Sequence, residues 1–269
     1  MMRLSTLANR AALAVAIAMT AVALIGANEA SAEEPMAGNA SLEFDDKDGT
    51  LNIEWSGPIA RGMADYLHST FAAYGAELHR VNLFLDSAGG QVEEGDRVIR
   101  VLDELKQMRR LVTVVEDDKL CASMCIPIFL QGNDRLAGRT SGWIFHEVAA
   151  PGADKKELKQ QTLQLLDRYY VPAGVSADWI KRIIPIIERA NLWQCGGDLI
   201  KANTGIVMHP LEMWTERIAA RSGDPAKLEA ARRTRSNSRD PTSRCYSAPN
   251  LRPGNARRDR ASRPRADRV

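Results

Sequence analysis

The chain has 269 residues, with 36 basic and 34 acidic side chains, a formal net charge of +2 and 45% hydrophobic residues. A charge so close to neutral favours no particular class of partner, because long-range attraction to nucleic acid or anionic lipid needs an excess of one sign. The length is sufficient for one sizeable α/β core.

A targeting segment is predicted at residues 1–32. Arg3 and Arg10 give it a basic start, residues 11–25 are almost purely apolar, and residues 30–32 (Ala-Ser-Ala) form a small-residue cleavage site. The apolar run is short for a spanning helix, which favours a cleavable signal peptide over an uncleaved N-terminal anchor. No later stretch is long and apolar enough to cross a bilayer. We therefore predict a periplasmic or secreted protein.

The first half of the mature chain is predicted to alternate strands and helices. Alternating apolar and polar residues at 42–44 and 51–55 flank an Asp-Gly turn, which predicts a β-hairpin. Residues 81–85 are typical of a buried strand, 91–108 of an amphipathic helix and 111–115 of a second buried strand. This order predicts a right-handed βαβ unit in a mostly parallel sheet and places the chain in the α/β class.

The second half is predicted to contain shorter elements within the same domain, which we place at residues 33–222. They are, in order, an apolar helix at 121–130, strands at 135–137 and 142–145, helices at 155–170 and 177–187, a short helix at 198–203, a strand fragment at 205–207 and a last helix from 210 to about 220.

The C-terminal residues 223–269 are predicted to be a disordered basic tail. From residue 231 onward there are twelve Arg, no Lys and three Asp, with few apolar residues. Such a segment cannot bury enough surface to offset the entropy lost on ordering. A basic tail can attach to an anionic membrane surface or to nucleic acid. It can equally be a solvated tail without a partner, and we favour that interpretation.

Residues typical of nucleophilic catalysis recur in a fixed order. A serine nucleophile needs a base to take its proton and hydrogen-bond donors for the oxyanion. Ser123 follows a loop and precedes a predicted helix, whose positive dipole end would lie under it. Gly89 and Gly90 permit close approach of backbone N–H donors, the N–H of Met124 is a natural second donor, and His146 ends a predicted strand. Alternatively, Ser123 is only a helix cap and His146 a structural residue.

Three motifs resemble those of the proteolytic subunit of the Clp protease. Residues 87–92 (Ser-Ala-Gly-Gly-Gln-Val) resemble its Ser-Pro-Gly-Gly-x-Val, with Ala88 in place of Pro. Residues 122–124 (Ala-Ser-Met) resemble its nucleophile motif, and residues 144–146 (Ile-Phe-His) its strand-end histidine. The Cys-Ala-Ser-Met-Cys form, together with an export signal, resembles the periplasmic branch of the Clp-protease/crotonase-like group. The resemblance covers residues 81–207.

The resemblance implies a ββα-superhelix fold and serine-peptidase chemistry. It implies these roles: Ser123 as nucleophile, His146 as general base, Gly90 or Gly89 and Met124 as oxyanion donors. The family places an Asp before its final helix, where this chain has Asn191, with Asp198 as a poorer second choice. An Asn can orient a histidine but cannot stabilise an imidazolium as a carboxylate does, so weak or absent activity is expected if Asn191 is the third member.

Four cysteines in an exported chain favour disulfides, and four allow three pairings. Cys121 and Cys125 would share one face of a helix, where a disulfide could clamp the serine turn. A redox pair is disfavoured because the spacing is not Cys-x-x-Cys, and a metal site because no second ligand pair is suitably spaced. Cys195 and Cys245 then either pair or stay free.

Together these features predict an exported serine peptidase-like protein that hydrolyses short or unfolded peptides and needs no cofactor. No ATP-driven unfoldase is expected as a partner, because no ATP supply exists outside the cytoplasm. Analogy with the ring-forming family predicts a homo-oligomer. The alternative is a catalytically degenerate binding or scaffold protein of the same fold, which Asn191 favours. Acyl-CoA chemistry of the crotonase type is less favoured, because CoA is cytoplasmic and does not use a Ser-His pair.

Overall fold

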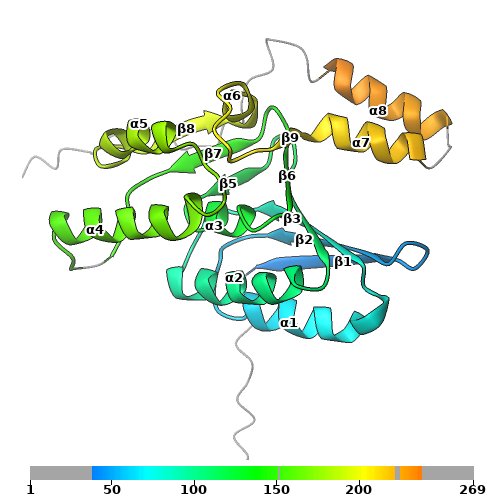
Figure 1. Cartoon of the computed structure of the whole chain (residues 1–269), viewed down its shortest axis with the longest axis horizontal. Helices are drawn as coiled ribbons and strands as arrows, with labels where there is room; N and C mark the ends of the chain where they lie inside the picture. Colours follow the sequence, from blue (N-terminus) through cyan, green and yellow to red (C-terminus); the bar gives the residue numbers. More distant parts are fainter. Residues whose placement is uncertain (1–37, 151, 222–224, 238–269) are drawn as a thin grey trace, which may run out of the picture. The chain divides into compact units, whose positions relative to one another are not determined.

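The computed structural model describes residues 38–150, 152–221 and 225–237, which form a mixed α/β structure (Figure 1). The predicted signal peptide, residues 1–32, lies outside the described residues, as does the part of the basic tail after residue 237. None of the described helices has the length and apolar character needed to span a bilayer.

A six-stranded sheet carries the first half of the chain. Its strands, in spatial order, are β1 (Asn39–Asp45), β2 (Thr50–Ser56), β3 (Arg80–Asp86), β4 (Arg110–Val115), β6 (Asp134–Ala137) and β9 (His209–Pro210). The β1–β2 pair is antiparallel and all other neighbours are parallel. The predicted hairpin and the predicted parallel strand–helix–strand unit are therefore confirmed.

Two helices lie side by side against this sheet, α1 (Met63–Tyr74) and α2 (Val92–Lys106), and a short 3₁₀ turn, η1 (Gly75–Glu77), follows α1 (Figure 1). Alternate residues of β2 and β3 point into the core, which α2 closes with Val98 and Leu102. The strand period of two and the helix period of 3.6 thus present matching apolar faces. A second, smaller cluster forms where β4 and β6 meet α7 (Leu211–Arg221).

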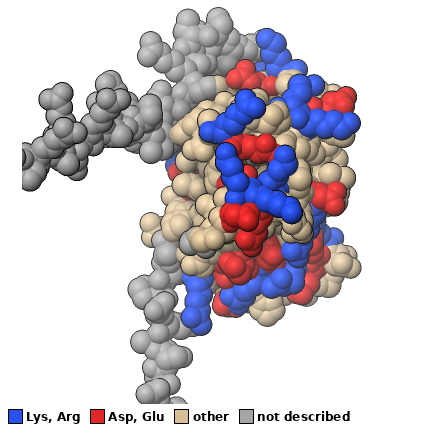
Figure 2. Space-filling model, turned by 90° about the vertical axis from the view of Figure 1, so that its left-hand side faces the viewer, with Lys and Arg blue, Asp and Glu red and all other residues tan. Residues whose placement is uncertain are grey.

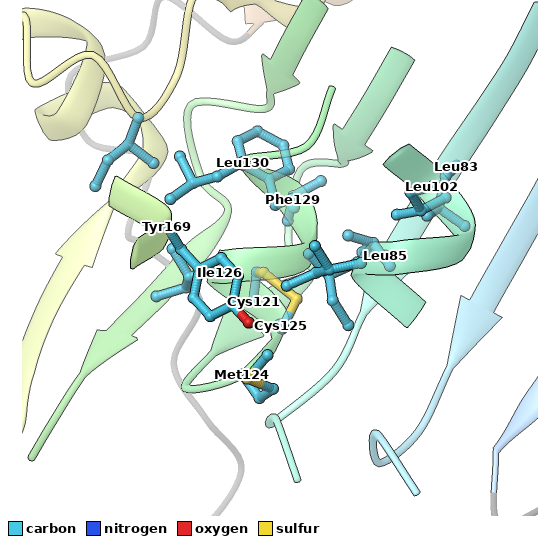
Figure 3. Packing of buried hydrophobic residues seen from close by; sticks show 14 of the residues in the cluster. Leu83, Leu85, Leu102, Cys121, Met124, Cys125, Ile126, Phe129, Leu130 and Tyr169 are labelled. Carbon is cyan, nitrogen blue, oxygen red and sulfur yellow. A yellow bond between two sulfur atoms is a disulfide. The ribbon is translucent and has the colours of Figure 1, made fainter. Parts of the chain in front are cut away.

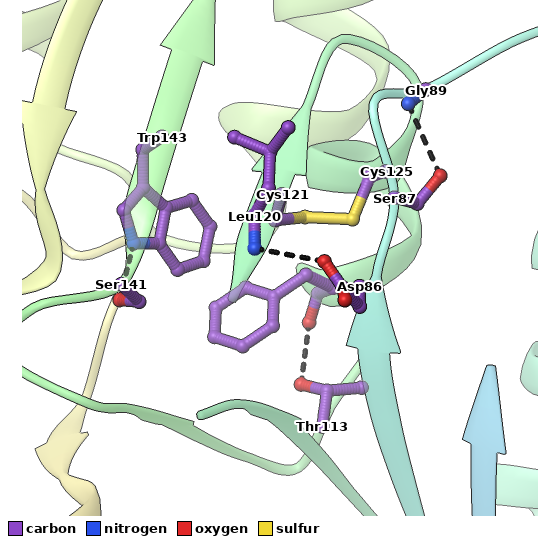
Figure 4. The surroundings of a disulfide bond; sticks show 10 residues. Asp86, Ser87, Gly89, Thr113, Leu120, Cys121, Cys125, Ser141 and Trp143 are labelled. Carbon is purple, nitrogen blue, oxygen red and sulfur yellow. Dashed lines mark hydrogen bonds between the residues drawn. A yellow bond between two sulfur atoms is a disulfide. The ribbon is translucent and has the colours of Figure 1, made fainter. Parts of the chain in front are cut away.

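A second sheet holds the middle of the chain and consists of β5 (Leu120–Ala122), β7 (Gly142–Phe145) and β8 (Leu192–Cys195). It is linked to the first sheet at the end of β3. Ser87 N–H donates to Leu120 O at 2.7 Å, and Ala122 N–H donates to Ser87 O at 2.9 Å. The Asp86 carboxylate also accepts from Leu120 N–H at 3.1 Å (Figure 4). The residues that follow β3 therefore lie beside those that follow β5.

The prediction of a helix at 121–130 is wrong for its first residues. The chain forms strand β5, a turn at Ser123 and Met124, and then only the five-residue helix α3 (Cys125–Phe129). Periodicity cannot separate a strand from a helix when every residue of an apolar run is buried, as nearly all are here. A five-residue helix also lends much less dipole to Ser123 than the predicted ten residues would.

The remaining elements are helical, and those at Ala177–Ile187 and Gly196–Lys201 contact β8 of the second sheet. They are α4 (Lys155–Leu165), its continuation as a π-helical turn η2 (Leu166–Tyr170), α5 (Ala177–Ile187) and α6 (Gly196–Lys201), followed by α7 and α8 (Pro225–Asn237). The strand predicted at 205–207 instead forms a few residues later, as β9. Helix α8 occupies the beginning of the segment predicted to be a disordered tail, so that prediction does not hold for residues 225–237.

Helix α3 is buried within the main hydrophobic cluster (Figure 3). Ile126 and Phe129 are fully buried, and Phe129 packs edge-on against Trp143 of β7 with ring centroids 4.8 Å apart. Leu85 of β3 and Leu102 of α2 belong to the same apolar cluster. The turn that carries Ser123 is therefore held by close-packed secondary structure on both sides.

Candidate active site

Ser123 occupies a sharp turn between β5 and α3. Its φ is +53°, in the left-handed region that residues other than glycine rarely adopt. The conformation is fixed from both sides: Ser123 N–H donates to Ile144 O at 3.1 Å, and Ser123 O accepts from Ile126 N–H at 3.0 Å. The residue itself is half-buried. A strained serine between a strand and a helix is the arrangement by which a nucleophile elbow exposes its hydroxyl.

A disulfide joins Cys121 to Cys125 and brackets this turn, with Cα atoms 5.3 Å apart (Figure 4). The predicted pairing is thus confirmed, although Cys121 belongs to a strand rather than to the predicted helix. Both cysteines are fully buried. The bond ties the strand before Ser123 to the helix after it. Cys195 is disulfide-bonded, so the alternative in which it stays free is wrong. Cys245 lies outside the described residues, so its place as the partner of Cys195 stays a prediction.

The diglycine turn after β3 lies directly against the serine turn. A Cβ atom at Gly89 would lie 2.5 Å from Ser123 Cβ and 3.1 Å from Met124 N. Gly89 also has a φ of +93°, so glycine is required there for both conformation and space. The structure therefore brings together two segments that are more than thirty residues apart in the sequence, as the motif order predicts.

Only one of the two glycines has its N–H available. Gly89 N–H donates to Ser87 Oγ at 3.1 Å (Figure 4), which removes it as an oxyanion donor. The N–H groups of Gly90 and Met124 donate no hydrogen bond to any of the described residues. Free backbone N–H groups beside a serine hydroxyl are suited to holding a tetrahedral oxyanion.

His146 follows the last residue of β7 and is half-buried. Its Nδ1 lies 2.6 Å from the main-chain carbonyl oxygen of Glu147. A carbonyl oxygen can only accept, so Nδ1 donates in this contact, and in the neutral imidazole the lone pair is then on Nε2. This is the tautomer that a general base needs. Glu147 was not singled out in the sequence, because its contribution comes from the main chain and is independent of residue type.

One cavity of about 90 Å³ joins these groups, several times the roughly 10–15 Å³ that a single water needs. Ser123, His146, Gly90 and Met124 all line it. Within the described part of the chain, however, no hydrogen bond joins Ser123 Oγ to His146. Unliganded sites often hold catalytic groups at longer separations that close only in the complex, so proton transfer requires the Ser123 and His146 side chains to approach each other when substrate binds.

Asn191 does not take the position predicted for a third member. Phe145 of β7 pairs with Leu192 of β8, which puts Asn191 one step beyond the ladder, level with His146. Its side chain is nevertheless exposed and does not line the cavity. The Nδ1 partner of the ring is Glu147 O instead. Asp198, the second choice, is exposed on α6.

The far wall of the cavity comes from helices that sequence reasoning did not connect with the site. These wall residues are mostly apolar: Leu165, Leu166, Tyr170, Ile183 and Ile187. They lie on one face of the predicted amphipathic helices at 155–170 and 177–187, and only their position in the fold shows that this face meets Ser123. No cluster of three or more His, Cys, Asp or Glu suited to a metal ion occurs among the residues that the structure describes.

Comparison with known proteins finds similarity to solved structures but none to protein families or curated sequences. No protein-family model matches the chain, and no curated protein matches it. Among solved structures, a mutant of ClpP1 from Listeria monocytogenes is similar to it, with a TM-score of 0.47 and 18% identity; the match covers 61% of this chain and 91% of that one. Likeness of this degree assigns no function. The functional proposal is therefore drawn from this chain's own residues.

Proposed function

We propose that this chain is an exported serine hydrolase that cleaves peptides by acyl transfer through Ser123. The observation that carries the proposal is the convergence of four groups on one cavity: the strained Ser123, His146 with its Nδ1 held by Glu147 O, and the free N–H groups of Gly90 and Met124. Each group corresponds to one requirement of serine-based catalysis, namely a nucleophile, a base and two oxyanion donors.

The reaction would proceed in two halves. Ser123 Oγ attacks the substrate carbonyl carbon while its proton passes to His146 Nε2, and the carbonyl oxygen becomes an oxyanion held by Gly90 and Met124 N–H. His146 then gives the proton to the departing amine, which leaves an ester on Ser123. A water, deprotonated by the same imidazole, hydrolyses the ester and restores the free serine.

The motif resemblance supports a place in the Clp-protease/crotonase-like group with the ββα-superhelix fold, and the signal at residues 1–32 supports export to the periplasm or beyond. An exported enzyme has no ATP-driven unfoldase to feed it. Its substrates would be short or already unfolded peptides, and a homo-oligomer would follow by analogy with the family.

The second candidate function is a binding or scaffold protein that keeps the fold without turnover. Two observations favour it: the absence of a Ser123–His146 hydrogen bond among the described residues, and a neutral carbonyl instead of a carboxylate behind the imidazole. A neutral acceptor orients the ring but stabilises the imidazolium less than a charged one.

A fluorophosphonate probe separates the two functions, because it phosphonylates a serine only when that serine is activated. The hydrolase proposal predicts labelling of the exported protein that disappears in Ser123→Ala. The matched control is Ser69→Ala, which removes an exposed hydroxyl from α1 and should leave labelling unchanged. An unlabelled wild-type protein of native stability would leave the binding function as the better account.

A further inference from the structure

Two neighbouring tyrosines end helix α4, and only one of them has a partner. The helix finishes in the π-helical turn η2, closed by Val171 N–H donating to Leu166 O at 3.2 Å. Turns of this kind are rare and often occur at functional sites. The wider turn lets consecutive side chains both point inward, so Tyr169 and Tyr170 are 7% and 4% exposed. Tyr169 donates its hydroxyl proton to Asp96 Oδ1.

Tyr170 has no such acceptor. Its hydroxyl makes no hydrogen bond to any described residue, although a buried tyrosine hydroxyl normally finds one. The oxygen also keeps some accessible area, unlike the fully enclosed and unpartnered oxygens of Asn82 and Gln194. Burial raises the pKa of the Tyr170 phenol, so the group stays protonated and is a hydrogen-bond donor at neutral pH.

Tyr170 lines the active-site cavity. Among the described residues that line the cavity, the polar side chains besides Ser123 and His146 are those of Tyr170 and Thr162. The Thr162 hydroxyl is already used, because it donates to Leu158 O at 2.8 Å and accepts from Val148 N–H at 2.9 Å. The remaining wall is apolar. Among the described lining residues outside the reacting pair Ser123 and His146, Tyr170 is thus the side chain whose donor is not already used, in a wall that is otherwise apolar.

We propose that Tyr170 is a specificity-determining residue, whose hydroxyl donates a hydrogen bond to the substrate side chain that enters this cavity. Because the cavity is lined by Ser123 and by both oxyanion donors, that side chain is the one on the residue whose carbonyl is attacked. The selected class is a long, mostly apolar side chain with an acceptor atom near its end. The inference rests on the proposed function and adds the substrate class to it.

A matched pair of peptides tests this choice. They differ only before the scissile bond, where one carries O-methylhomoserine and the other norleucine, so that an ether oxygen replaces a methylene in side chains of nearly equal size. One hydrogen bond of ordinary strength predicts a preference of roughly five- to tenfold in kcat/KM for the ether peptide. In Tyr170→Phe the preference should vanish, with the norleucine peptide cleaved within about twofold of wild type.

The control for folding is the thermal unfolding midpoint of Tyr170→Phe beside that of wild type. A preference that survives in Tyr170→Phe, or equal rates in the wild-type protein, would overturn the proposal. If neither peptide is hydrolysed, the proposed function fails, and a binding measurement then tests whether Tyr170 selects the side chain. Binding of the two peptides to Ser123→Ala, measured by fluorescence anisotropy, must then show the same preference, lost in the double variant with Tyr170→Phe. Equal affinities in Ser123→Ala would refute it.

Discussion

The two sides of the candidate site are built very differently. The serine side is held by strand β5, helix α3, a buried disulfide and the diglycine turn packed against it. The histidine side ends a short strand, and the described structure fixes its ring through a single hydrogen bond to the adjacent carbonyl of Glu147. Charged side chains do not supply the missing restraint, since the ring has no carboxylate partner in the described ion pairs.

This contrast shows what each half of the mechanism demands. A nucleophile in a strained backbone conformation persists only where its surroundings over-determine it, and the serine side meets that condition. The base needs the correct tautomer and the freedom to move within hydrogen-bond reach of Ser123. We therefore expect a nucleophile held in place by its surroundings, an imidazolium without carboxylate stabilisation, and slow rather than absent hydrolysis.

The charged side chains on the surface do not alter the contrast between the serine side and the histidine side. On the face seen in Figure 2, acidic and basic side chains are interspersed. Pairs such as Arg97–Asp65, with its nitrogen and oxygen 2.5 Å apart, and Lys106–Asp103, at 2.8 Å, account for part of the charge on α1 and α2. Such exposed pairs contribute little to stability, about 0–1 kcal/mol each. The mixture of basic and acidic side chains on the face seen in Figure 2 offers no large field of one sign to steer a charged substrate.

Removing the base on the histidine side should have the largest effect on the rate of hydrolysis. His146→Ala should lower kcat/KM for an unfolded peptide by roughly 10²–10⁴-fold, the usual contribution of a general base. His68→Ala, an exposed histidine on α1, is the matched control and should leave the rate unchanged. Equal rates for the wild type and His146→Ala would show that the imidazole takes no part.

Filling the space between the two turns should have the next largest effect. Gly89→Ala would put a methyl group 2.5 Å from Ser123 Cβ, and the displaced Met124 N–H should lower kcat by roughly 10²–10³-fold, as the loss of an oxyanion donor does. Gly152→Ala has a similar positive φ of +83° but no atom within 4 Å. It controls for backbone strain and should retain full activity.

The sequence predicted the serine side better than the histidine side. The order of Gly89, Gly90, Ser123 and His146 was sufficient because β5 runs parallel to β7 and is bridged in parallel to Ser87 after β3, so the residues that follow all three strands come together. The strand before Ser123 was missed, since a fully buried apolar run lacks the alternation that identifies a strand. The partner of His146 could not be found at all, because a main-chain carbonyl leaves no trace in the residue sequence.

For the helices too, the sequence predicted the elements themselves but not how they pack around the site. The amphipathic helices at 91–108 and 155–170 were predicted from their period, and the hairpin from its Asp-Gly turn. That Ile183 and Tyr170 meet the site depends on how α4 and α5 pack, which a single sequence does not specify.

The disulfide should have an intermediate effect. Cys121→Ala with Cys125→Ala should lower the free energy of unfolding by about 2 kcal/mol, the value expected for such a short closed loop. Activity should fall by about tenfold at a temperature where the variant remains folded, because the disulfide no longer links the strand before Ser123 to the helix after it and the strained turn is held less firmly. Circular dichroism and peptide hydrolysis at the same temperature measure both. Unchanged kcat in a folded double variant would show that β5 and α3 suffice to hold the turn.

The smallest effect is expected at Asn191. Asn191→Ala should change kcat/KM by less than about twofold, since the Nδ1 proton is already accepted by Glu147 O and the Asn191 side chain is exposed. Hydrolysis of the same unfolded peptide provides the measurement. A loss of a hundredfold would instead restore Asn191 as the third member and would mean that the ring turns in the working enzyme.

The central claim is that Ser123 is an activated nucleophile, and trapping its acyl intermediate tests that claim most directly. The protein would be mixed with an activated ester, quenched in acid within the first turnover, and digested for tandem mass spectrometry. The account predicts an acyl group on the peptide that contains Ser123, formed much more slowly in His146→Ala and absent in Ser123→Ala. No acylation of Ser123, or acylation at the same rate without His146, would contradict it.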